Sequence, residues 1–208
     1  MTTTGRWLET WRALGVADTP ELRLVYEELI ARYSEAHRFY HTVRHLNECF
    51  AQFRDLRPSA ERAGEVELAL WFHDAIYDVR RSDNEARSAE WARSSALAAG
   101  LGREAADRVR SLIMFTRHAA EPAGIDAQVL VDTDLSILGA APARFDEYER
   151  QIRQEYGWVS EFVFRRKRRA ILEEMLARPR IFSTALFYLR YEDAARSNLS
   201  RSIARLRT

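Results

Sequence analysis

Apolar residues recur every three or four positions along most of the chain, which is the pattern of amphipathic helices. After Thr19 and Pro20, this stripe comprises Leu22, Val25, Tyr26, Leu29, Ile30 and Tyr33. Thr is a favoured helix cap, and Pro is favoured at the first helical position. The spacing therefore predicts a helix that begins at Pro20.

Similar stripes predict further helices over residues 103–116, 126–138, 160–177 and 192–206. Ser82 and Glu85 have the spacing of a capping box, and Gly100 follows as a C-terminal stop. There is no alternating strand pattern, internal repeat or evident linker. We therefore expect one all-α domain of about eight helices over residues 1–208, with its core at about 20–206.

Residues 66–72 are apolar almost all round, which predicts a buried helix, and His73 and Asp74 follow directly. Burying an ionisable pair costs several kcal/mol, about 3 or more, unless a partner compensates it. Hydrogen bonds from elsewhere in the fold would satisfy both groups. A metal ion is the alternative.

Composition restricts the class of protein. The chain has 208 residues, 47% of them hydrophobic and 30% charged, with a net charge of +1. This balance predicts no nucleic-acid or membrane partner. The single cysteine, Cys49, excludes a disulfide framework and is expected to be buried packing. No signal peptide or membrane span is evident, so we expect a cytoplasmic protein.

Histidines and aspartates supply the candidate metal chemistry. His37, His41 and His45 are spaced four apart, so on a helix they would share one face. Asp132 and Asp134 interrupt an apolar segment, where a helix-capping role explains one aspartate more easily than two. Nitrogen and oxygen donors without thiolates suit one divalent ion among Mn, Fe, Co, Ni, Mg and Zn.

Five strings carry a resemblance to a known family: RFYHTVRHL, WFHDAIYD, DNEARSA, DTDLSILG and ARSNL. They resemble the HD-domain superfamily, and within it a branch of predicted metal-dependent HD phosphohydrolases of similar length. The resemblance implies a helical HD bundle that holds one ion. Its metal ligands would be His45, His73, Asp74 and Asp134. Asp134 is preferred to Asp132 because the family's last ligand usually sits shortly before a core leucine.

The resemblance also implies hydrolysis of a small phosphate ester, with nucleotides among the candidates. Glu85 would then be the general base near the metal-bound water, besides its capping role. His118 would donate to a phosphate oxygen or the leaving group, or else stabilise a helix end. Asp78 would hold the water or simply end a helix.

Cationic side chains are the candidates for binding substrate phosphate. The candidates are His41, Arg44 and Arg117. Arg44 directly precedes His45, Arg117 directly precedes His118, and His41 lies four positions before His45. A guanidinium group pairs well with phosphate oxygens. Surface ion pairing is the default for any single arginine, because the chain has 31 acidic residues. The basic run 165–169 winds through a full helical turn, which is typical of a solvated face rather than a nucleic-acid site.

Two other functions are compatible with the same residues. One is a catalytically weak HD domain that senses a nucleotide. The other is a di-iron HD oxygenase, which would need more ligands than the sequence offers.

Overall fold

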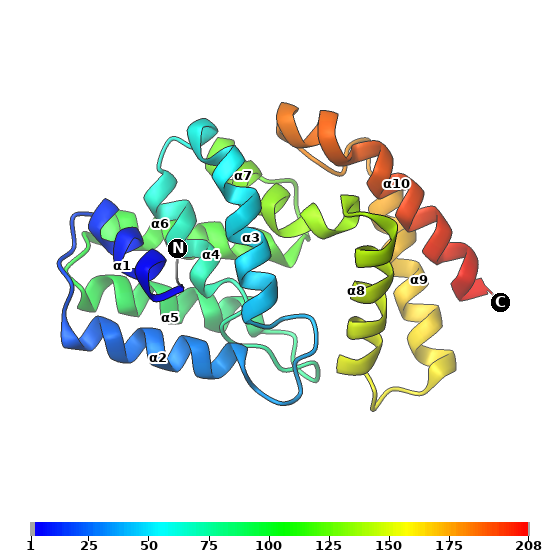
Figure 1. Ribbon diagram of the computed structural model, residues 1–208, viewed down its shortest axis with the longest axis horizontal. Helices are drawn as coiled ribbons and strands as arrows, with labels where there is room; N and C mark the ends of the chain where they lie inside the picture. The colour runs from blue at the N-terminus through cyan, green and yellow to red at the C-terminus, as the bar shows by residue number, and fades with distance from the viewer. Residues whose placement is uncertain (1–2, 208) are drawn as a thin grey trace. The chain divides into compact units, whose positions relative to one another are not determined.

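The computed structural model describes residues 3–207, and all regular secondary structure within them is helical (Figure 1). The α-helices are α1 (Thr3–Ala13), α2 (Pro20–Tyr33), α3 (Val43–Leu56), α4 (Ala63–Phe72), α5 (Asn84–Ala98), α6 (Arg103–Met114), α7 (Ile125–Leu135), α8 (Pro142–Glu155), α9 (Glu161–Ala177) and α10 (Ala185–Arg207). Three short 3-10 turns accompany them: η1 (Arg57–Ser59), η2 (Phe115–Arg117) and η3 (Ser136–Gly139). The all-α prediction is confirmed, with more helices than the eight expected.

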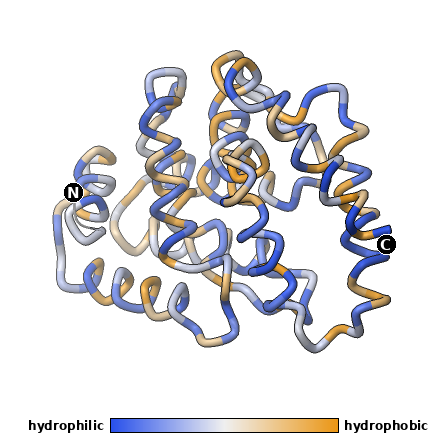
Figure 2. Tube along the Cα trace, turned by 45° about the vertical axis from the view of Figure 1, so that its right-hand side comes forward, coloured by the Kyte–Doolittle hydropathy of each residue, from blue (hydrophilic) through white to orange (hydrophobic). Residues whose placement is uncertain are grey.

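The chain divides into two compact units, Met1–Thr133 and Asp134–Thr208. The division falls inside α7, so this helix begins in the first unit and ends in the second. Hydrophobic and hydrophilic residues alternate every few positions along the helices (Figure 2), as expected where a helix buries one face. Within residues 3–207, no helix combines the length and apolar character needed to cross a membrane.

Helix α4 is the centre of the first unit. Its residues 65–72 are all buried, and α1, α3, α5 and α6 pack around it. Trp71 lies at this junction, with its ring centroid 5.2 Å from that of Trp7 and 4.6 Å from that of Phe50. Its indole Nε1 donates to Thr10 Oγ1 at 3.1 Å. The prediction of a buried helix over 66–72 is confirmed, because helices contact it on several sides.

The helix boundaries show which sequence signals decided local structure. Thr19 caps α2 as predicted, since its Oγ1 accepts the Leu22 N–H at 3.3 Å. The capping box of Ser82 and Glu85 is wrong, because α5 begins later, at Asn84. Asp83 takes the cap position instead, so Glu85 falls at the second helical position, where it cannot complete a box with Ser82.

Helices α8, α9 and α10 and the turn η3 make up most of the second unit. Helix α10 begins at Ala185, earlier than the predicted 192, because the Thr184 hydroxyl accepts the Phe187 N–H and Phe187 packs against Phe182. Asn198 on α10 donates to the carbonyls of Leu138 and Ala140 at 2.8 and 2.9 Å. These bonds join the strings DTDLSILG and ARSNL, so part of the sequence signal in both is structural.

The basic run on α9 is divided among several partners. Arg168 donates to Tyr148 Oη at 2.8 Å and pairs with Glu149 of α8, while Arg165 donates to the Arg205 carbonyl at 2.7 Å. Arg166 and Lys167 are exposed. The run therefore bonds α9 to its neighbours and presents only part of its charge to solvent.

Candidate metal centre

His45 enters the core at the first turn of α3. Thr42 caps this helix, with its Oγ1 accepting the Arg44 N–H at 3.3 Å, and the His45 side chain is only 2% exposed. His37 and His41 lie in the turns before the helix. The expectation that all three histidines share one helical face is therefore wrong, because the helix starts at Val43.

His73 and Asp74 follow the last turn of α4 rather than lying inside it. Phe72 ends the helix, His73 keeps α-helical backbone angles as its cap, and Asp74 begins the next turn. His73 is 1% exposed, whereas the Asp74 side chain is 17% exposed. His73 therefore lies at the buried end of α4, and the side chain of Asp74 next to it is partly exposed to solvent.

Three side-chain atoms converge at this point. The Nε2 atoms of His45 and His73 are 3.1 Å apart. Asp74 Oδ2 lies 3.1 Å from the His73 Nε2 and 3.5 Å from the His45 Nε2. Two donors bound to one ion at about 2.0–2.2 Å stand roughly 3.0–3.5 Å apart. We call these three residues the donor triangle, and its dimensions fit a single metal ion.

The hydrogen bond of His73 makes this convergence informative. Its Nδ1 lies 2.8 Å from the Leu70 carbonyl oxygen, which can only accept, so we assign the ring proton to Nδ1. In neutral His73 the Nε2 lone pair then faces both the carboxylate of Asp74 and the imidazole of His45. Acceptor atoms so close repel unless a proton or a cation lies between them. A divalent cation satisfies all three at once.

The electrostatics keep Asp74 ionised. Burial raises the pKa of this carboxyl, but the positive charges that His73 and His41 carry when protonated, and the hydrogen bonds that His45 and His73 then donate, outweigh it. The net effect holds the pKa of Asp74 well below its usual value. A carboxylate that stays charged at neutral pH is the form that binds a metal ion.

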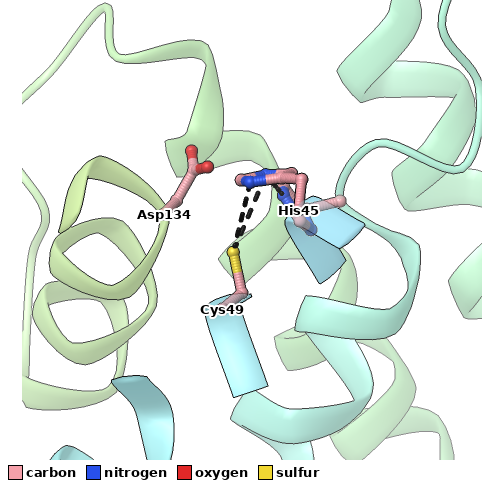
Figure 3. Close-up of side chains that lie close together, drawn as sticks. His45, Cys49 and Asp134 are labelled. Atoms are coloured by element: carbon pink, nitrogen blue, oxygen red, sulfur yellow. Dashed lines mark hydrogen bonds between the residues drawn. The ribbon is translucent and has the colours of Figure 1, made fainter. Parts of the chain in front are cut away.

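Cys49 and Asp134 are two further potential ligands. Within the first unit, ligand atoms of His45, Cys49 and His73 all lie within 4.8 Å of one another. Figure 3 shows the Cys49 sulfur next to the imidazole of His45. Asp134 sits on the last turn of α7, directly after Thr133, and belongs to the second unit. Asp132, two positions earlier on the same helix, is fully buried and does not belong to this group.

The position of Cys49 argues against a ligand role. Its Sγ lies 3.7 Å from both ring nitrogens of His45. Because the two distances are equal, the sulfur lies on the plane midway between Nδ1 and Nε2. An ion on the Nε2 lone pair would lie off that plane, roughly 4 Å from the sulfur, against about 2.3 Å for a metal–sulfur bond. Cys49 thus packs beside the ring. Its place one turn after His45 on α3 was the signal that could have placed it there from sequence.

Of the candidates for phosphate binding, His41 lies nearest the donor triangle. Its ring stacks on Tyr77 with centroids 4.1 Å apart and lies 5.9 Å from the ring of His45. Arg44 is exposed, and its Nε donates to Glu48 on the next turn at 3.2 Å. Arg117 is exposed at the end of η2.

The candidates for proton transfer lie in three places. Glu85 is half-buried on the first turn of α5, and Ser88 of that helix contacts the backbone of Ile76. Asp78 is exposed, and its carboxylate accepts the Arg80 N–H at 2.9 Å. His118 follows η2 with a left-handed φ of 54°. None of the three belongs to the group of potential ligands found among the described residues.

Arg38 and Tyr33 are two buried residues at this site that sequence reasoning did not identify. Tyr33 Oη accepts the Asp74 N–H at 3.3 Å, and Arg38 Nη1 donates to the Asp74 carbonyl at 2.6 Å. Tyr33 was expected only as part of the apolar stripe of α2. The chain has 32 lysine and arginine residues, and nothing in the sequence distinguishes Arg38 among them.

Comparison with known proteins identifies no family for this chain. No protein-family model matches the chain, and no curated protein or solved structure matches it significantly.

Proposed function

We propose that this chain is a metal-dependent phosphohydrolase of the HD-domain type, acting on a small phosphate ester. The observation that supports the proposal is the donor triangle of His45, His73 and Asp74, in which two imidazole nitrogens and a carboxylate oxygen lie at the spacing of ligands to one ion. The resemblance of the surrounding strings to HD phosphohydrolases supports it independently. Nucleotides are among the candidate substrates.

The proposed ion is held by the donor triangle, with Asp134 as the fourth protein ligand. Two imidazoles and two carboxylates favour Mn, Fe, Co, Ni or Zn over Mg, which prefers an all-oxygen shell. A divalent ion at such a site polarises a phosphoryl oxygen and lowers the pKa of water. Residues 45, 73 and 134 are buried or half-buried, which limits competition from bulk solvent.

The neighbouring side chains have roles that follow from their positions. His41 lies beside Asp74 and is half-buried, so its imidazole is placed to donate to a phosphate oxygen on the exposed side of the triangle. Tyr77, stacked on this ring, holds its orientation. Glu85 is our candidate general base, because its helix contacts the loop that follows Asp74.

The test combines metal analysis with a panel of phosphate esters on three proteins: wild type, Asp74→Ala and the control Asp107→Ala. Asp107 is an exposed carboxylate that pairs with Arg93 at 2.6 Å. We expect about one equivalent of metal and hydrolysis in wild type and control, and loss of both in Asp74→Ala. Circular dichroism checks that each variant is folded.

Each other outcome contradicts a named part of the proposal. Metal retained by Asp74→Ala would mean that the donor triangle is not the metal site. Activity without metal would show that the ion is not catalytic. Two irons per chain would indicate the oxygenase, and a nucleotide retained without metal would indicate the sensor.

A further inference from the structure

The main chain of Asp74 is held from both sides. Its N–H donates to Tyr33 Oη at 3.3 Å, and its carbonyl accepts from Arg38 Nη1 at 2.6 Å. The Tyr33 hydroxyl in turn donates to the Trp71 carbonyl at 3.2 Å. The peptide groups on both sides of the Asp74 side chain are therefore fixed.

Arg38 bonds two loops with one guanidinium group. Nη1 donates to the His41 carbonyl at 3.2 Å as well as to Asp74, Nη2 donates to the Ala75 carbonyl at 3.0 Å, and Nε donates to Glu35 at 3.1 Å. The side chain of Arg38 is 0% exposed. The turn that leads into α3 and the turn that follows α4 are thus joined at a buried cation.

These two turns present all three members of the donor triangle. His45 stands just after the first turn, whereas His73 and Asp74 begin the second. The planar guanidinium donates in several fixed directions within one plane, which sets the separation of the carbonyls that it binds. A lysine ammonium would lack that fork, and it would reach fewer of the four acceptors.

We propose that Arg38 and Tyr33 are positioning residues for the metal centre, which fix the Asp74 backbone so that Oδ2 faces both histidines. The inference rests on the proposed function, because it assumes that the donor triangle binds a metal ion. Neither residue would touch the ion or the substrate. Loss of a residue that orients a ligand typically costs about 10- to 100-fold in metal affinity, even though every ligand remains in place.

The second unit contains a matched control for this arginine. Arg196 donates from Nε to Glu192 at 2.8 Å, and its other nitrogens donate to the carbonyls of Leu176, Arg178 and Pro179 at 2.8–3.1 Å. It therefore makes the same kind of network, with one carboxylate and three carbonyls. None of the groups that it binds belongs to the donor triangle.

The experiment measures cobalt(II) affinity by competition with a chelator, together with the visible cobalt spectrum and the melting temperature without metal. The proteins are wild type, Arg38→Lys, Tyr33→Phe and Arg196→Lys. We expect Arg38→Lys to bind cobalt about 10- to 100-fold more weakly with an altered spectrum, and Tyr33→Phe to bind it less than about 10-fold more weakly. Arg196→Lys should lower the melting temperature but keep the wild-type affinity and spectrum.

The inference is overturned if Arg38→Lys and Tyr33→Phe melt earlier but bind cobalt as wild type does, since their role would then be structural only. Equal loss of affinity in Arg196→Lys would overturn it too. If Arg38→Lys does not fold, Tyr33→Phe decides, because it removes one hydroxyl only. The proposed function fails separately, if wild type binds the ion but hydrolyses no phosphate ester.

Discussion

The two units bury charged groups in different ways. In the second unit, the Glu192 carboxylate accepts the N–H groups of Ile181 and Phe182 and pairs with Arg196. Every close partner of this carboxylate is a donor. In the first unit, the atoms that face Asp74 Oδ2 are imidazole nitrogens, and one of them carries a lone pair.

This difference separates a structural polar group from a candidate site. Buried polar groups in native proteins are generally hydrogen-bonded, so burial by itself says little about function. The Glu192 network is complete without any further component. In the donor triangle the Nε2 lone pair of neutral His73 faces the Asp74 carboxylate, an arrangement that a proton or a cation between them would stabilise, which is why we propose the metal centre there.

Removal of Glu192 is expected to have the largest effect on stability. Glu192→Ala leaves two backbone N–H groups and Arg196 without their carboxylate, so we expect a loss of about 3–5 kcal/mol in the free energy of unfolding. Denaturant titration measures it, with the exposed Glu173→Ala as the control at about 0.5 kcal/mol or less. The metal content of the folded protein should not change. A stable Glu192→Ala protein that had lost its metal would contradict the separation of the two roles.

A methyl group at Gly139 tests the packing of the second unit. A Cβ added there would lie 2.5 Å from the Cβ of Tyr191, which sits on a helix and has little room to shift. We expect Gly139→Ala to reduce the free energy of unfolding by about 1–3 kcal/mol. Gly102→Ala is the control, because a Cβ at that position meets nothing within 4 Å. Equal stability of both variants would show that α10 can move away from η3.

Substitution of Cys49 is expected to have the smallest effect and sharpens the definition of the metal centre. Cys49→Ala removes a sulfur that packs beside the His45 ring, which should cost about 1 kcal/mol of stability. Metal affinity and the cobalt spectrum should stay as in wild type, because the sulfur lies off the line of either nitrogen lone pair. Loss of a sulfur-to-cobalt charge-transfer band in the variant would show instead that Cys49 binds the ion.

Local structure was predicted best where the signal was itself local. Thr19 and Pro20 fixed the start of α2, because a cap needs only the next few residues. The almost entirely apolar run of residues 66–72 predicted the burial of α4. The start of α5 was missed, because Asp83 rather than Ser82 occupies the cap position. The start of α10 was placed too late, because the aromatic stretch after Thr184 turned out to be helical.

The sequence by itself determined the helical class, the buried helix that precedes His73 and Asp74, and the chemical types of the candidate ligands. Hydrophobic period and residue chemistry are properties of neighbours along the chain, so they can be read without coordinates. Only the tertiary structure decided that the side chains of His45, His73 and Asp74 meet at 3.1–3.5 Å, and that Arg38 and Tyr33 hold the backbone between them. Such contacts depend on where distant helices end and how their turns pack, and no local pattern encodes those distances.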